Sequence, residues 1–112
     1  MRKTDKKLEN ALRVGLTEAC EMALEKHEGF RWLTHFANYQ HFPDSLTIVC
    51  VFETNEQLSK ADEEGVCEII KNKLASININ IKDIRQHINF DTEENCEKEN
   101  NGKWNERFTS LC

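Results

Sequence analysis

The segment from Ser45 to Gln57, SLTIVCVFETNEQ, constrains the fold more than any other part of the chain. Residues 46–52 are apolar at nearly every position, so both faces of a strand here would be apolar, as in a central strand that is covered on both sides. Thr54, followed three residues later by Gln57, matches a capping box, which satisfies the free amides of a new helix. The segment therefore predicts a sheet at the centre of the molecule and excludes a purely helical DNA-binding bundle.

Hydrophobic periodicity predicts the elements on either side of this strand. Apolar residues spaced by threes and fours indicate a helix over about residues 5–27, which ends near Gly29. The aromatic-rich residues Phe30–Tyr39 predict a strand that pairs antiparallel with the central one through the loop at 41–45. A second helix is expected over about residues 55–75, with an interruption at Gly65.

The C-terminal part is predicted to be a strand region followed by a helical region. Isoleucines alternate with polar residues over 77–81, which is typical of a half-buried strand. The alternation resumes from Ile84 to Phe90, which either continues that strand beyond a bulge or forms another one. Asp91 or Thr92 is then placed to cap a last, acidic helix.

Together these elements predict an α+β fold in the order α-β-β-α-β, with a mainly antiparallel sheet covered by helices. The chain of 112 residues has room for a single domain. We expect the core in residues 1–90 and an acidic helical or irregular C-terminal extension in 91–112. The longest apolar run is too short for a membrane span, and no apolar segment is placed to act as a secretory signal, so the sequence predicts a cytoplasmic protein.

Side chains capable of catalysis or metal binding are present, but not in the spacing that such sites require. The five cysteines form no CxxC pair and the four histidines are scattered among them, so neither a disulfide framework nor a zinc site is predicted. Asp44, Glu53 and Asn55 partly match the signature of metal-dependent nucleases. However, the lysine position holds Asn55, and the two carboxylates would lie about 30 Å apart at the ends of one strand. We therefore expect no enzyme, no catalytic or metal-binding residue and no cofactor.

The charge of the chain is negative overall and unevenly distributed. The net charge is −5, with basic residues near the start and acidic residues near the end. Such polarity would orient a partner or pair two copies head to tail, although two solvated helix faces explain it better. Since phosphate is bound by Lys and Arg, the candidates for nucleic-acid contact are Arg2, Lys3, Lys6, Lys7 and Arg13.

Two classes of function fit these observations. The first is a non-enzymatic binding or regulatory module that acts through contacts with a protein partner or with a second copy of itself. Its candidate contact residues are aromatic: Trp32, Tyr39, Trp104 and Phe108. The second is a nucleic-acid-binding transcriptional regulator that uses the basic N-terminal helix. An enzyme would need a cleft that gathers His35 or His87 with Glu53 or Asp91, and no membrane partner is expected.

Three stretches carry a resemblance that spans nearly the whole chain: MRKTDKKLENALR, WLTHFANYQHFPDSLTIVCVFET and FDTEENCEKENNGKW. They resemble a family of small gammaproteobacterial proteins without an established activity, whose members are often named Fis-family transcriptional regulators. The resemblance implies a bacterial, cytoplasmic protein, and the name implies a C-terminal helix-turn-helix that enters the major groove of DNA. Because the matching part here is β-patterned over Ile77–Phe90 and acidic over Asp91–Glu99, we assign no DNA-contact residue to it.

Overall fold

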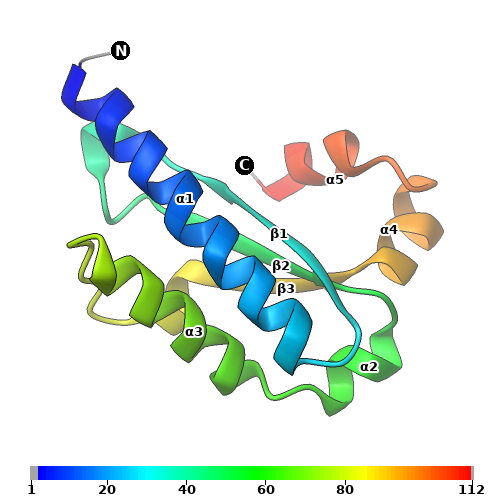
Figure 1. Ribbon diagram of the computed structural model, residues 1–112. Coiled ribbons are helices and arrows are strands. Elements are labelled where there is room, and N and C mark those ends of the chain that lie inside the picture. Colours follow the sequence, from blue (N-terminus) through cyan, green and yellow to red (C-terminus); the bar gives the residue numbers. More distant parts are fainter. Residues whose placement is uncertain (1–2, 112) are drawn as a thin grey trace.

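The strand predicted at the centre of the molecule is β2 (Thr47–Phe52). The computed structural model, which describes residues 3–111, places it in the middle of a three-stranded sheet (Figure 1). β2 pairs antiparallel with β1 (Phe30–Phe36) and parallel with β3 (Ile88–Thr92). Residues 48–52 are at most 1% exposed, which confirms a central strand covered on both faces.

Helices surround this sheet in the order that the sequence predicts. Within the described residues they are α1 (Lys3–Lys26), α2 (Asn55–Lys60), α3 (Glu63–Ser76), α4 (Glu93–Asn100) and α5 (Trp104–Leu111). Short 3-10 turns lie at Tyr39–His41 and Ile84–His87. α1 and α3 lie side by side across one face of the sheet (Figure 1). The α+β fold in the order α-β-β-α-β, with a helical C-terminal extension, is therefore confirmed.

The two faces of β2 pack against different elements, which explains why both are apolar. Ile48, Cys50 and Phe52 join the main hydrophobic core with residues of α1 and α3. Val49 and Val51 point to the opposite face, where α5 contacts the sheet through aromatic rings. Burial of apolar area on both sides of one strand holds the helical layer and the C-terminal helices in a single fold.

Both predicted N-caps are present, but the capping box at Thr54 is incomplete, because Oε1 of Gln57 has no hydrogen-bond partner among the described residues. The Oγ1 atom of Thr54 accepts a hydrogen bond from the amide of Gln57 at 3.1 Å, at the start of α2. The Oγ1 atom of Thr92, one of the two predicted alternatives, accepts from the amide of Asn95 at 3.0 Å, at the start of α4. Each cap satisfies an amide that has no partner inside its own helix.

Two predicted boundaries differ from the structure. The helix expected over 55–75 is divided, but between α2 and α3 at Ala61–Asp62 and not at Gly65. The break falls there because Asp62 is itself an N-cap, whose Oδ1 atom accepts from the amide of Gly65 at 3.0 Å. The strand expected over residues 30–39 ends at Phe36, and Tyr39 already belongs to the 3-10 turn that leads back to β2.

The strand predicted over residues 77–81 is wrong. This segment is a loop, and its amides turn back to the end of α3, where those of Ile77 and Ile79 both donate to the carbonyl of Leu74. Ile79 and Ile81 are nevertheless buried, at 6% and 8% exposure. The alternating isoleucines thus anchor a loop to the core here. A half-buried strand would show the same alternation in sequence. Of the two alternatives for 84–90, a separate strand is correct, and it begins only at Ile88.

Candidate interaction surface

The basic residues predicted to contact nucleic acid lie along the first half of α1, as far as the structure describes them. Lys6, Lys7 and Arg13 are exposed, and none of them forms an ion pair with another described residue. Arg2 lies outside the described residues, as does the side chain of Lys3. Three of the five candidates are therefore available to a negatively charged partner on one helix.

Acidic residues dominate the second half of the same helix. Glu18, Glu21 and Glu25 are exposed there, and only Glu18 among them is paired within the described chain, with Lys73 of α3 at 3.6 Å. α1 therefore presents positive charge toward its N-terminus and negative charge toward its C-terminus, in addition to the helix dipole, which has the same sense.

Three of the four aromatic residues predicted to contact a partner form one cluster, on the sheet face that α5 covers. The ring of Trp32 meets those of Trp104 and Phe108 edge-on, with centroid distances of 4.9 and 6.3 Å. Phe108 also contacts Phe36 of β1, at 5.2 Å. The indole Nε1 of Trp32 donates to Glu93 Oε1 at 2.7 Å. These half-buried rings dock α5 onto the sheet, so most of their contact area is used within the chain.

Tyr39 lies apart from this cluster, in the 3-10 turn after β1. Its ring stacks on that of Phe42 with a centroid distance of 5.8 Å. Burial raises the pKa of its hydroxyl, and the negative charges of Glu9 and Asp5 on α1 raise it further. The structure therefore places Tyr39 beside the N-terminal half of α1 and separates it from the other three candidates.

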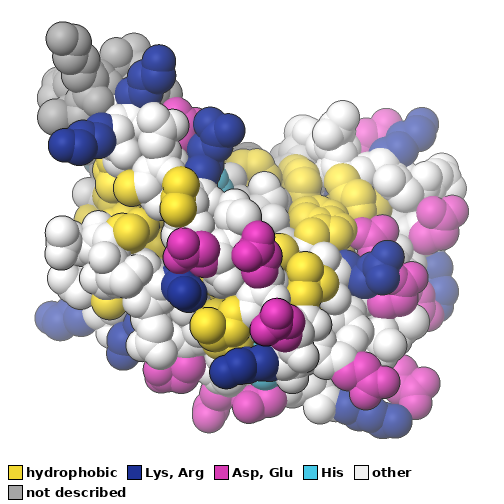
Figure 2. Space-filling model, in the orientation of Figure 1, with side chains coloured by type: hydrophobic (Ala, Val, Ile, Leu, Met, Phe, Trp, Pro, Cys, Tyr) yellow, Lys and Arg dark blue, Asp and Glu magenta, His cyan; other side chains and the backbone are white. Residues whose placement is uncertain are grey.

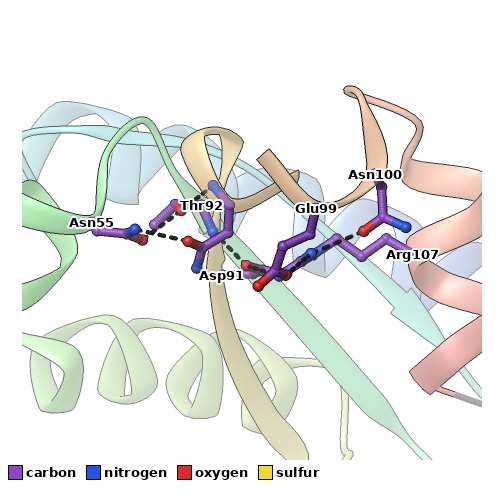
Figure 3. Close-up of polar contacts among 7 residues, drawn as sticks. Asn55, Asp91, Thr92, Glu99, Asn100 and Arg107 are labelled. Atoms are coloured by element: carbon purple, nitrogen blue, oxygen red, sulfur yellow. Dashed lines mark hydrogen bonds and ion pairs between the residues drawn. The ribbon is translucent and has the colours of Figure 1, made fainter. Parts of the chain in front are cut away.

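A polar network that the sequence does not predict lies at the carboxyl ends of the parallel strands β2 and β3 (Figure 3). Asn55, at the start of α2, accepts from the Thr92 hydroxyl at 2.7 Å and donates to Asn95 Oδ1 at 2.7 Å. This end of a parallel sheet is where many α/β proteins bind ligands. Here, however, the three side chains bond to one another, and the network joins the starts of α2 and α4.

Arg107 of α5 extends the same region through a two-pronged ion pair with Asp91 of β3. Its Nε and Nη2 atoms donate to the two carboxylate oxygens at 2.5 and 3.0 Å, and its Nη1 donates to Glu99 at 2.5 Å and to Asn100 Oδ1 at 3.0 Å (Figure 3). Hydrogen bonding to Asp91 raises the pKa of Arg107 further above its ordinary value. Asp91 is a predicted cap candidate, but nothing in the local pattern indicates that Arg107 is its partner.

The residues that an enzyme would have to gather are engaged separately. Nδ1 of His87 donates to the backbone carbonyl of Leu46 at 2.7 Å, Glu53 pairs with an exposed arginine of β1 at 2.9 Å, and Asp91 is held by α5. Burial lowers the pKa of His35, which lies on β1. In the described part of the chain, no hydrogen bond or ion pair joins either histidine to Glu53 or Asp91.

The described cysteines carry free thiols. They are Cys20, Cys50, Cys67 and Cys96, and burial raises the pKa of each of them. Cys112 lies outside the described residues. Over residues 3–111, no group of three or more His, Cys, Asp or Glu side chains is arranged to hold a metal ion.

A groove with a volume of about 270 Å³ runs between α1 and β1, along the outer edge of the sheet. We call it the α1–β1 groove, and its lining comprises Arg13, Leu16, Thr17, Cys20 and Glu21 of α1 with Leu33, Thr34 and His35 of β1. Val14 and Leu24 are exposed to 60% and 50%, and helical spacing from Thr17 and Cys20 places them along the same surface. Figure 2 shows hydrophobic side chains gathered between α1 and α5 on this side of the molecule.

A second hollow, of about 600 Å³, lies where the end of α1 meets α2 and the start of α3. Its walls carry both signs of charge, including Lys26, Lys60 and Asp62, so its electrostatics favour no class of charged ligand. The Oε1 atom of Gln57 beside it is buried and has no hydrogen-bond partner among residues 3–111. The side chain of Gln57 lies against Gly29, where an added Cβ would come within 2.8 Å of that oxygen.

No helix in residues 3–111 is both long enough and apolar enough to cross a membrane. A comparison of the chain with models of known protein families finds no match, and comparisons with curated proteins and with solved structures find none either. The α1–β1 groove and the two exposed apolar side chains beside it therefore stand as the candidate site on physical grounds.

Proposed function

We propose that this protein is a non-enzymatic binding or regulatory module of the cytoplasm that acts through protein contacts. The observation that carries the proposal is the exposure of Val14 and Leu24 on α1, the helix that forms one wall of the α1–β1 groove. Large apolar side chains that border a groove at an open sheet edge are typical of a surface that a protein partner covers. Four free thiols agree with a reducing compartment.

The side chains that could act in catalysis form ion pairs and hydrogen bonds within the chain, and this supports a non-enzymatic role. The carboxylates of Glu53 and Asp91 are neutralised by arginines, and the hydrogen-bonding groups of Asn55, Thr92 and Asn95 are used by one another. These side chains therefore stabilise the fold. A general acid or base would instead have to reach a substrate in a cleft.

Site-specific photocrosslinking tests this proposal. A photoreactive phenylalanine analogue replaces Val14 or Leu24, and in the matched control it replaces Asn72, which is exposed on α3. We expect protein adducts in cells from positions 14 and 24 and few from position 72. Equal yields from all three positions, or adducts from none, would show that this surface is not a protein-binding site.

Nucleic-acid binding is the second candidate, and the unpaired Lys6, Lys7 and Arg13 favour it. Binding through these cations would weaken steeply as salt rises, because it releases counterions from phosphate. Fluorescence anisotropy against random duplex DNA and a structured RNA, from low to physiological salt, measures it. Lys6→Glu with Lys7→Glu should abolish such binding, while Lys71→Glu on α3 should not. Absence of binding at low salt would reject this candidate.

A further inference from the structure

The outer edge of β1 is open. β1 is an edge strand of the sheet, and within residues 3–111 no other backbone pairs with its outer side. It has seven residues and no proline, and its only Lys or Arg, Arg31, is already paired with Glu53. A bulge between Phe30 and Trp32 leaves residues 32–36 regularly paired to β2. Such an edge offers its free backbone groups to another strand.

The other edge of the sheet differs. β3 has five residues, and Arg85 lies over the ring of Phe90 at 5.0 Å while pairing with Glu63 at 2.6 Å. A short strand with a charged side chain beside it is a common means of protecting a sheet edge. The contrast between the two edges points to β1 as the side on which the sheet can be extended.

The α1–β1 groove is centred on Thr17 of α1 and Thr34 of β1. A two-fold axis at this centre would bring each of these residues close to the same residue of a second copy. On α1 its lining runs from Arg13 to Glu21, which are equally spaced in sequence on either side of Thr17. On β1 its lining is centred on Thr34, which is also the middle of the regular segment 32–36. An axis through this point, perpendicular to the sheet, would pair β1 antiparallel with a second β1 and lay two copies of α1 antiparallel to each other.

The charges of α1 are complementary in that arrangement. Arg13 of one copy would face Glu21 of the other, twice across the axis, and neither residue has an ion-pair partner within the described chain. The basic first half of each helix would lie along the acidic second half of its partner. Antiparallel pairing also places the positive end of each helix dipole beside the negative end of the other, which is favourable. The exposed Val14 would lie near the stretch from Cys20 to Leu24 of the other copy, which would cover apolar area on both.

We propose that two copies of this chain associate through the β1 edge and α1, forming a continuous six-stranded sheet with the α1–β1 grooves merged at its centre. This inference rests on the proposed protein-contact function and names its partner as a second copy.

A charge swap across the axis tests the association. Sedimentation velocity of the full chain, from low to high micromolar concentration, should show a monomer–dimer equilibrium. Arg13→Glu alone and Glu21→Arg alone each create two like-charge contacts, and each should weaken the dimer about tenfold. The double variant should restore dimerisation, and so should a mixture of the two single variants, because positions 13 and 21 then carry opposite charges at both contacts. The matched controls, Lys71→Glu and Glu68→Arg on α3, should leave it unchanged.

The results separate this inference from the proposed function. A wild-type chain that stays monomeric at every concentration overturns the association, and so does a dimer that neither single variant weakens. Rescue in the mixture rules out misfolding as the cause of a loss, and far-UV circular dichroism of each variant checks this independently. If photocrosslinking at positions 14 and 24 captures a different protein while the isolated chain is monomeric, the protein-contact function stands and self-association fails.

Discussion

Replacing Arg107 with alanine should destabilise the fold by about 2–3 kcal/mol. The arginine makes two charge-assisted hydrogen bonds to Asp91, and the two side chains are only 16% and 14% exposed. Removing one partner of a fully buried pair costs roughly 3–5 kcal/mol. We reduce that figure because water still reaches the pair and because the amide of Thr92 continues to donate to the Asp91 carboxylate.

Urea denaturation followed by far-UV circular dichroism measures this effect as a change in midpoint at constant slope. Lys98→Ala is the control, since its pair with Glu94 is solvent-exposed and should contribute less than about 0.5 kcal/mol. Adding Asp91→Asn to Arg107→Ala should recover part of the loss, because the uncompensated charge disappears. If Arg107→Ala lies within about 0.5 kcal/mol of the wild type, the ion pair does not hold α5 in place and our reasoning fails.

Three further outcomes follow from local geometry. Gly29 has φ +87°, and a Cβ there would come within 2.7 Å of Gln57 Cδ, so Gly29→Ala should cost about 1–3 kcal/mol in thermal denaturation; a neutral result would contradict the packing. Because burial lowers the pKa of His35, its contribution to stability should be complete above the unfolded pKa of about 6.5 and decline below it. His35→Gln should flatten that dependence between pH 8 and 5, and unchanged curves would argue against burial. Cys50, whose thiol pKa burial raises strongly, should react with Ellman's reagent only after unfolding, whereas the half-buried Cys20 should react first among the four described thiols.

The sequence predicts well the features that depend on neighbouring residues. The central strand and the caps at Thr54 and Thr92 are visible because each depends on a pattern only a few residues long. The isoleucines of the 77–81 loop mislead because burial alone, without a backbone ladder, produces the same alternation. Which side chains are buried is predicted there, but which backbone conformation buries them is not.

The candidate site is less accessible from sequence. Four of the basic candidates, Lys3, Lys6, Lys7 and Arg13, fall on one helix as expected, whereas Arg2 lies outside the described residues. The aromatic candidates are separated, because Trp32 contacts Trp104 while Tyr39 stacks on Phe42. Arg107 reaches Asp91 only after the turn between α4 and α5 has set the direction of the last helix. The open edge of β1 is also a property of strand order, which no local pattern specifies.

The aromatic cluster under α5 also determines what the molecule's intrinsic fluorescence can report. The chain has two tryptophans, and both lie in this cluster with their ring centroids 4.9 Å apart, outside the main core. Indole emission will therefore follow the docking of α5, while circular dichroism follows the whole helical content. If the last helix releases before the rest of the fold, the emission will shift at lower denaturant than the dichroism, and the interval between the two curves will report how weakly α5 is docked relative to the rest of the fold.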